Sequence, residues 1–422
     1  MRLFTHINSI GVCTSLVALL LVPRPLLAQH DGWIATWTAS PEPLQVDSSE
    51  PLLNIENQTV RERVRVSIGG AQLRLRLSNE CGAGPLLVGA VTVGSPTVPA
   101  AVRPGSIRTV TFDGHGSITV PPGAPILSDP IHFPVTDGAE ISISLFIPKR
   151  LAATTWHELA LKRAIISPPG DYTHSEQIQD GRESPHSILI SALLVPARRS
   201  QRLIVAFGDS IVDGDGSTLD GDDTWPSDLT RRLKENGTDS KVAVVNEGIG
   251  GNRLLSDGPM PSLGVSALAR FDRDVLSLPG VTHVVLLEGL NDIGFPGAKL
   301  GNFSLADPAD IRTDEDVIGA YRQLIARAHA RGIKVIGATL NPCEGVDIPG
   351  YYSETKEATR RAVNRWIRNS GAFDGVIDFD RILRDPDHPS RLAPRFASDD
   401  HLHPNHDGYQ AMADAIDLSL FQ

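Results

Sequence analysis

The pattern of apolar residues changes once along this chain, and this change constrains the fold more than any other feature of the sequence. From about residue 33 to residue 196, apolar and polar residues alternate. Leucine alternates with arginine over residues 72–78, and the segments 63–68 and 140–145 follow the same pattern. A period of two is typical of β-strands that bury one of their two faces.

Short runs of this kind recur throughout the first part of the chain, for example at residues 86–93, 107–112 and 187–195. Glycine, proline, asparagine and aspartate interrupt them at short intervals. Many short alternating strands separated by turn residues are typical of an antiparallel β-sandwich. We therefore expect residues 33–196 to form a β-sandwich accessory domain.

A second pattern begins after a polar, basic joint at residues 196–202. Continuous apolar runs cover residues 203–207, 242–245, 283–287, 333–340 and 375–379. Between them, residues 317–328 and 355–367 repeat apolar side chains at helical spacing. Strands that are apolar throughout, alternating with helices, predict an α/β domain whose parallel sheet is covered on both faces. A chain of 422 residues has room for this domain, assigned to residues 203–422, and for the first one.

Polar residues follow the first three of these runs, at the strand ends where α/β proteins bind ligands. Gly208-Asp209-Ser210 follows the first run, residues 246–252 follow the second, and residues 288–292 follow the third. A fourth polar segment, residues 399–405, lies near the C-terminus. Together they supply a serine, a histidine, an acid and segments rich in glycine and asparagine. These are the components of nucleophilic acyl transfer, in which a base activates serine and N–H groups stabilise the oxyanion.

These four segments, in this order, resemble the sequence blocks of the GDSL or SGNH hydrolase family of esterases and lipases. The resemblance covers about residues 203–422 and implies a three-layer, flavodoxin-like domain with a parallel sheet. It implies that Ser210 is the nucleophile and that Asp400 and His403, three residues apart, are the acid and the base. The Gly-x-Ser-x-Gly elbow of other serine hydrolases is absent around Ser210.

The same resemblance assigns the oxyanion hole to three groups. The backbone N–H of Ser210 is the first donor, and the N–H of Gly251, five residues after Asn246, is the second. The side-chain amide of Asn291 is the third. Some secreted members of the family are similar in layout, with a β-rich N-terminal domain that opens in a segment like the Trp-Ile-Ala-Thr-Trp of residues 33–37.

The N-terminal residues have the features of an export signal. An apolar run over residues 10–22 follows Arg2, and its length fits a signal peptide but not a membrane span. The alternative is a buried N-terminal helix. We expect a signal peptide at residues 1–28, a secreted or periplasmic enzyme, and no stable membrane insertion. Cleavage would remove Arg2 and Arg24 and no acidic residue, so the net charge would change from −11 to −13.

The composition limits the classes of partner and substrate that we expect for this protein. Asp and Glu number 50 against 39 Lys and Arg, which argues against nucleic acid as the main partner. Aromatic residues make up only 5%, and no long apolar lid separates the blocks. We therefore expect a small-molecule or polysaccharide substrate, with a short-chain acyl or carbohydrate O-acetyl ester. The alternatives are a lipase or lysophospholipase, an acyltransferase with the same triad, a non-catalytic glycan-binding protein and a metal hydrolase.

Three other groups of residues could carry chemistry. His401, His403 and His406 could suggest a metal site, but no further ligand cluster supports it, and we expect no cofactor. Aspartates at positions 213, 215, 220, 222 and 223 lack the spacing of an EF-hand, so we expect a solvated loop, with weak calcium binding as the alternative. Cys81 and Cys343 are expected to be buried free thiols that could pair only if the two domains brought them together.

Overall fold

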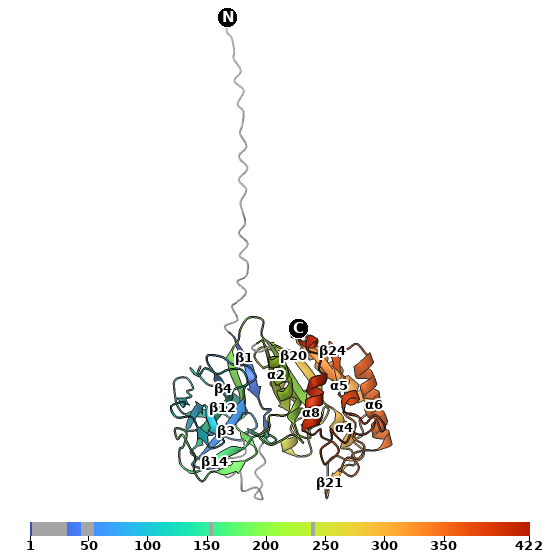
Figure 1. Ribbon diagram of the computed structural model, residues 1–422, viewed down its shortest axis with the longest axis horizontal. Helices are drawn as coiled ribbons and strands as arrows, with labels where there is room; N and C mark the ends of the chain where they lie inside the picture. The colour runs from blue at the N-terminus through green and yellow to red at the C-terminus, as the bar shows by residue number, and fades with distance from the viewer. Residues whose placement is uncertain (2–31, 44–54, 152–154, 238–240) are drawn as a thin grey trace.

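Strands up to Pro196 pair antiparallel, and those from Arg202 to Ile377 that form the large C-terminal sheet pair parallel. The computed structural model describes residues 1, 32–43, 55–151, 155–237 and 241–422. In Figure 1 the antiparallel part, blue to green, lies beside the second part, whose later segments are yellow to red. Apart from Met1, the expected export segment at residues 1–28 lies outside the described residues.

Two larger antiparallel sheets form the first part, within the described residues. The first has the order β1 (Trp33–Thr38), β17 (Ile190–Pro196), β4 (Arg74–Asn79) and β11 (Ala124–Leu127). The second has the order β15 (Arg182–Ser184), β14 (Ala164–Pro169), β3 (Gln58–Arg65), β12 (Glu140–Ile147), β6 (Ala90–Gly94) and β9 (Arg108–Thr109). The expected antiparallel β-rich region is therefore present.

Shorter strands complete this part. They are β2 (Glu42–Pro43), β13 (Thr155–His157) and β16 (Ser187–Ile188) in one small sheet, β5 (Leu86–Val88) with β10 (Ile118–Val120), and β7 (Pro96–Val98) with β8 (Ala101–Val102). The alternating pattern sets which side chains enter the core. On β4, Leu75 and Leu77 are fully buried, whereas Arg74 on the other face lies over the ring of Trp33.

The second part is built on a parallel sheet. Its order is β19 (Val242–Gly248), β18 (Arg202–Gly208), β20 (Val281–Leu287), β23 (Lys334–Ala338) and β24 (Gly375–Ile377). This order is the flavodoxin-like one, and it confirms the predicted parallel sheet. Each strand overlaps one of the five apolar runs. The last strand is shorter than its run because the Asp378 side chain accepts a hydrogen bond from the backbone N–H of Arg381 and caps the helix that begins at Phe379.

Helices cover this sheet in two groups. The helices are α1 (Ser210–Asp213), α2 (Trp225–Glu235), α3 (Ala267–Phe271), α4 (Leu290–Gly294), α5 (Asp314–His329), α6 (Glu354–Asn369), α7 (Phe379–Leu383) and α8 (His406–Ala415). Helix α8 packs against α2 and α7, whereas α5 packs against α3 and α6. Residues 203–207 of β18 point alternately to the two faces of the sheet, and all are buried. Both faces are therefore covered, as the sequence predicts.

Short elements complete the second part: the hairpin of β21 (Lys299–Leu300) and β22 (Phe303–Ser304), and the helical turns η2 (Pro261–Leu263), η3 (Asp272–Leu276) and η4 (Leu418–Phe421). Among the described residues, no helix has the length and apolar character needed to cross a membrane. The structure records Cys81 and Cys343 as free thiols. Cys343 is buried as expected, but Cys81 is only partly buried, because it lies in the turn that follows β4.

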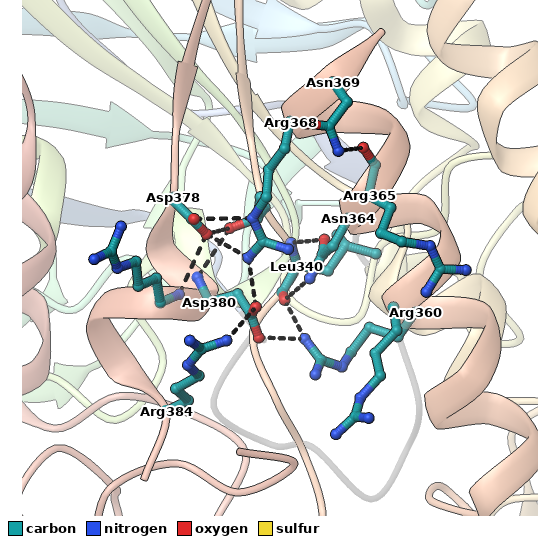
Figure 2. Close-up of polar contacts among 12 residues, drawn as sticks. Leu340, Arg360, Asn364, Arg365, Arg368, Asn369, Asp378, Asp380 and Arg384 are labelled. Carbon is teal, nitrogen blue, oxygen red and sulfur yellow. Dashed lines mark hydrogen bonds and ion pairs between the residues drawn. The ribbon is translucent and has the colours of Figure 1, made fainter. Parts of the chain in front are cut away.

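Polar side chains fasten α6 to the segments that follow β23 and β24, as Figure 2 shows. The amide of Asn364 accepts a hydrogen bond from Leu340 N–H (2.8 Å) and donates one to the Leu340 carbonyl oxygen (2.9 Å). Arg360 and Arg368 each form ion pairs with Asp380. These contacts fix α6 beside the carboxyl ends of β23 and β24.

The β-rich part docks on the edge strand β19 of the parallel sheet. Strand β1 packs against β19. The hydroxyl of Ser67 accepts a hydrogen bond from Val244 N–H (2.8 Å), and the hydroxyl of Thr38 donates one to the carbonyl oxygen of Asn246 (2.8 Å). The two parts therefore meet next to the segment that follows β19.

Candidate active site

Ser210 lies where the central strand β18 gives way to α1. Asp209 caps this helix: its carboxylate accepts a hydrogen bond from Ile211 N–H at 3.0 Å. The turn lies tightly against β19, since a Cβ atom on Gly248 would come within 2.2 Å of the backbone nitrogen of Asp213. Ser210 is therefore held at the carboxyl end of the sheet, with 7% of its surface exposed.

His403 and Asp400 reach Ser210 from the turn before α8. The Oγ atom of Ser210 lies 2.8 Å from Nε2 of His403. On the other side of the imidazole, Nδ1 lies 2.5 Å from Oδ2 of Asp400. The three side chains thus form one continuous hydrogen-bonded line, with the histidine in the middle.

The surroundings of Asp400 and His403 set their charge states. Oδ1 of Asp400 accepts hydrogen bonds from Ser398 Oγ (2.6 Å), Leu402 N–H (2.9 Å) and His403 N–H (3.0 Å). Partial burial opposes ionisation of Asp400, but these bonds and His403 hold its pKa well below the usual range. Burial also disfavours a charged His403, yet the hydrogen bond with Asp400 and the charge of Asp215 raise the pKa of His403.

The segment 249–252 after β19 is pinned beside the Ser210 turn. Ile249 N–H donates to the carbonyl oxygen of Gly208 (3.1 Å), and Gly250 N–H donates to Oδ2 of Asp213 (3.1 Å). Gly251 has a φ of +67°, and a Cβ atom there would lie 2.8 Å from the side chain of Leu263. A glycine is needed at this position for both reasons.

Asn291 lies in α4, directly after β20, and its amide is oriented by two hydrogen bonds. Nδ2 donates to the carbonyl oxygen of Asn252 (2.9 Å), and Oδ1 accepts from the hydroxyl of Tyr351 (2.8 Å). An amide nitrogen carries two N–H bonds, so a second donor remains on Nδ2. The structure therefore links Gly251 and Asn291 through Asn252.

Arg270 and Tyr351 are structural parts of this site that the sequence did not reveal. Arg270 is fully buried and donates to the carbonyl oxygens of Gly208 (2.7 Å) and Glu247 (2.8 Å) and to Oδ1 of Asn252 (2.9 Å). It thereby ties the Ser210 turn to the Gly251 segment. An arginine in a short helix carries no sequence signal for burial, because most of its partners here, such as Gly208, Glu247 and Asn252, come from segments far away in the sequence.

The aspartates after Ser210 do not form the solvated loop that we expected. Asp213 and Asp223 are buried. Asp220 pairs with Arg63, and Asp222 pairs with Arg65, both on the polar face of β3. The expectation was wrong because the arginine face of that strand covers the loop instead of facing solvent.

His401 and His406 do not join His403 in one cluster. His401 is exposed and adopts a left-handed conformation with a φ of +59°. His406 begins α8, and its Nδ1 lies 3.0 Å from Oδ2 of Asp223.

One other cluster has ligand types that metals use. Glu42, His157 and Asp213 place one ligand atom each within 4.8 Å of one another. However, Nδ1 of His157 faces Glu42 and Nε2 faces Asp213. A metal ion bonds to only one nitrogen of an imidazole, so this arrangement fits a histidine that bridges two carboxylates better than a metal ligand set.

A cavity of about 490 Å³ lies between the β-rich part and the parallel-sheet part. Its lining includes Thr38, Lys162, Asp213 and Asp222, but neither Ser210 nor His403. This cavity is therefore not where a group attacked by Ser210 would lie.

The second part of the chain is similar to proteins that are already known. Residues 206–411 match the GDSL-like lipase/acylhydrolase family. No curated protein sequence matches the chain.

Several solved structures are similar to about half of the chain. A GDSL-like lipase from Bacteroides thetaiotaomicron is 19% identical, with a TM-score of 0.38, and the match covers 54% of this chain and 90% of that one. An aryl esterase from M. smegmatis is 16% identical, with a TM-score of 0.39 and coverage of 51% and 95%. A variant of an acetyl-xylooligosaccharide esterase from Geobacillus is 18% identical, with a TM-score of 0.38 and coverage of 51% and 91%.

Proposed function

We propose that the chain, whose residues 206–411 match the GDSL-like lipase/acylhydrolase family, is an ester hydrolase that cleaves short-chain acyl or carbohydrate O-acetyl esters through Ser210, His403 and Asp400. The observation that carries this proposal is the line of hydrogen bonds from Ser210 Oγ to His403 Nε2 (2.8 Å) and from His403 Nδ1 to Asp400 (2.5 Å). A nucleophile, a base and an orienting acid within hydrogen-bond distance are what serine catalysis requires.

In the proposed reaction, His403 takes the proton of Ser210 as Oγ attacks the ester carbonyl carbon. Asp400 stabilises the resulting imidazolium, and N–H groups of Ser210, Gly251 and Asn291 stabilise the oxyanion. The alcohol leaves with the proton from His403, and an acyl group remains on Ser210. Water then attacks the acyl group with His403 as base again, which releases the acid and restores the serine.

The polar surroundings of His403 support a small or carbohydrate ester. The side chain of Asp215, whose Oδ2 lies 3.7 Å from Nε2 of His403, is 48% exposed. An exposed carboxylate beside the base can accept hydrogen bonds from sugar hydroxyls, and it is an unfavourable neighbour for a long acyl chain. A lipase acting on fat droplets needs an apolar surface in this position.

The catalytic assignment is tested with Ser210→Ala. We expect kcat on p-nitrophenyl acetate to fall by roughly 10⁶-fold, by comparison with other serine hydrolases. A serine-directed phosphonate should label wild-type Ser210, and EDTA should leave the activity unchanged. Near-full activity of purified Ser210→Ala would show that the proposed mechanism is wrong.

The substrate class is tested with p-nitrophenyl esters of graded chain length and with acetylated xylan and pectin. We expect the highest kcat/KM for acetyl and butyryl esters. A preference for long acyl chains would favour the lipase or lysophospholipase alternative. Transfer of the acyl group to an added sugar, seen by product analysis, would identify an acyltransferase.

The domain organisation and location belong to the same proposal. Residues 33–196 would form a β-sandwich accessory domain, residues 203–422 the catalytic domain, and residues 1–28 a signal peptide of a secreted or periplasmic enzyme. The change of strand pairing between Pro196 and Arg202 supports the boundary. N-terminal sequencing of the protein from the culture medium or periplasm would test the cleavage near Ala28.

A further inference from the structure

A histidine of the β-rich part reaches the helix that begins with the proposed nucleophile. His157 ends β13 and is buried. Its Nε2 lies 3.1 Å from Oδ1 of Asp213, the last residue of α1. Its Nδ1 lies 3.1 Å from both the carbonyl oxygen of Ser40 and Oε1 of Glu42. Both nitrogens of one imidazole are therefore used, one on each side of the boundary between the two parts.

Asp213 also contacts the segment that contains Gly251. While Oδ1 faces His157, Oδ2 accepts a hydrogen bond from Gly250 N–H at 3.1 Å. The backbone of Asp213 is held as well, because Nδ2 of Asn246 donates to its carbonyl oxygen (3.2 Å). Asp213 thus fixes the residue directly before Gly251, the proposed oxyanion donor.

Glu42 and Ser40 anchor the other end of the line in the β-rich part. Oε2 of Glu42 accepts a hydrogen bond from Glu158 N–H (2.9 Å), so this carboxylate cannot turn away from His157 without losing a buried contact. The hydroxyl of Ser40 donates to Oε2 of Glu247 (2.6 Å) on β19. The line from Glu42 through His157 and Asp213 to Gly250 is therefore fixed at both ends.

The charge of His157 adds to these contacts. Burial disfavours a charged imidazole, but the carboxylates of Asp213 and Glu42 outweigh it and raise the pKa of His157 well above its usual value. A charged histidine is attracted by both carboxylates, although burial raises the pKa of Glu42 and so weakens its charge. Removing it leaves these carboxylates without their partner, which is costly in a buried place.

We propose that His157 is a positioning residue for ester cleavage: through Asp213 it holds the Gly250–Gly251 segment where the oxyanion forms. The inference rests on the proposed function of Ser210 and of the Gly251 N–H. It gives the β-rich part a role in catalysis itself, because the oxyanion segment of one part is held by a side chain of the other. Preorganised donors lose much of their value when they shift by about 1 Å, a displacement that costs roughly 100-fold in rate.

The test compares His157→Phe with Ser67→Ala in the full chain. Phenylalanine keeps the bulk of the ring and removes both polar contacts. Ser67→Ala is the matched control, because it also breaks a buried hydrogen bond between the two parts, to Val244 N–H (2.8 Å), but does not touch Asp213 or Gly250. Both variants are measured for kcat and KM on p-nitrophenyl acetate, for inactivation rate by diethyl p-nitrophenyl phosphate, and for Tm.

We expect His157→Phe to lower kcat and the inactivation rate by about 10- to 100-fold, with KM within about threefold of wild type. Ser67→Ala should keep the wild-type kcat even if its Tm falls by the same amount. His157→Gln, which can still donate to Asp213, should recover part of the loss. Combining His157→Phe with Asp213→Ala should lower kcat no further than Asp213→Ala alone, because both changes break the same line.

A folded His157→Phe variant whose kcat equals that of Ser67→Ala would overturn the inference. If His157→Phe does not fold, His157→Asn takes its place under the same criterion, since asparagine is too short to reach both carboxylates. Ser210→Ala, measured alongside, separates the two proposals. If Ser210→Ala is inactive while the His157 variants behave like wild type, only this inference fails; if Ser210→Ala is active, the proposed function fails.

Discussion

Asp215 is a charged residue that faces the proposed base from the side of the nucleophile. Its Oδ2 lies 3.7 Å from Nε2 of His403, and its side chain is about half exposed. Burial lowers the pKa of His403, whereas the hydrogen bond with Asp400 and the charge of Asp215 raise it. The net direction is upward, so Asp215 helps to keep the imidazole protonated.

This contact predicts how the pH profile responds to Asp215→Asn. His403 acts as a base only when it is neutral, so activity is lost as the pH falls through its pKa. Removing the charge of Asp215 lowers that pKa. The acidic limb of the kcat/KM profile should therefore move to lower pH, and the variant should stay active in more acidic buffer than wild type.

Asp399→Asn is the matched control, because Asp399 is an exposed aspartate in the neighbouring turn. Its profile should stay close to that of wild type. Added salt should reduce the difference between wild type and Asp215→Asn, since salt screens exposed charges. An unmoved acidic limb in Asp215→Asn would contradict the role assigned to this charge.

Tyr351→Phe tests the orientation of Asn291. The change removes the hydroxyl that donates to Oδ1 of Asn291 and leaves this buried acceptor without its partner. We expect kcat to fall by about tenfold with little change in KM, a loss equal to one hydrogen bond of about 1–1.5 kcal/mol. Tyr352→Phe, one residue later and only partly buried, should leave kcat unchanged. Equal rates for the two variants would mean that Asn291 does not need this contact.

At the residue scale, the sequence predicted those site residues that lie in a recognisable sequence motif. Ser210, Asp400 and His403 each lie in such a block, and the structure brings their side chains within hydrogen-bond distance. Arg270 and Tyr351 could not be predicted. Arg270 donates to Gly208 and Asn252, and Tyr351 donates to Asn291, and these partners are brought near only by the fold.

Among the elements, the parallel strands were predicted well because burial on both faces leaves a continuous apolar run. The run at 203–207 lies within β18 and the run at 283–287 within β20. Short strands such as β9 (Arg108–Thr109) have too few residues to show a period, so the run at 107–112 overestimated that strand. Helix α5 begins at a capping box of Thr313 and Asp316. The prediction of this helix relied on apolar spacing alone and did not use the capping box.

Helix α6 offers a prediction about stability. In Asn364→Leu, the backbone N–H of Leu340 loses its acceptor inside the protein (Figure 2). We expect the free energy of unfolding to fall by about 2–3 kcal/mol, since a buried unpaired donor costs about this much. Urea unfolding followed by circular dichroism measures the change.

Asn369→Leu is the control for this helix. The Asn369 amide donates to the carbonyl oxygen of Arg365 near the exposed end of α6. Its replacement should change stability by less than about 0.5 kcal/mol, as is usual for exposed positions. A similar fall in the free energy of unfolding in both variants would show that the buried Asn364 contact contributes no more stability than an exposed one.

For the whole molecule, the sequence showed two parts but not how they join. The aspartate loop was expected to be solvated, yet Asp220 and Asp222 pair with Arg63 and Arg65 on β3 of the other part. An alternating pattern indicates that one face of a strand is polar, but it does not indicate which residues contact that face. The join between the two parts therefore had to come from the structure.

This join predicts that the two parts unfold together. Domains of one chain commonly move and unfold independently unless their interface is extensive. Here backbone groups cross the boundary: Ala35 N–H donates to the carbonyl oxygen of Pro279 (3.1 Å), and Val244 N–H donates to Ser67 Oγ (2.8 Å). Separation would uncover β1 and β19 and leave these groups unpaired, so neither part is expected to stay folded after the other has melted.

Scanning calorimetry should therefore show one transition, with a calorimetric enthalpy close to the van't Hoff enthalpy. Circular dichroism and tryptophan fluorescence should follow the same curve, because both parts contain tryptophans, such as Trp37 and Trp225. Asp222→Asn removes a carboxylate that lies 2.7 Å from both Arg65 and Lys162. It should lower the midpoint of that one transition, whereas two transitions that move apart in the variant would show that the β-rich part folds on its own.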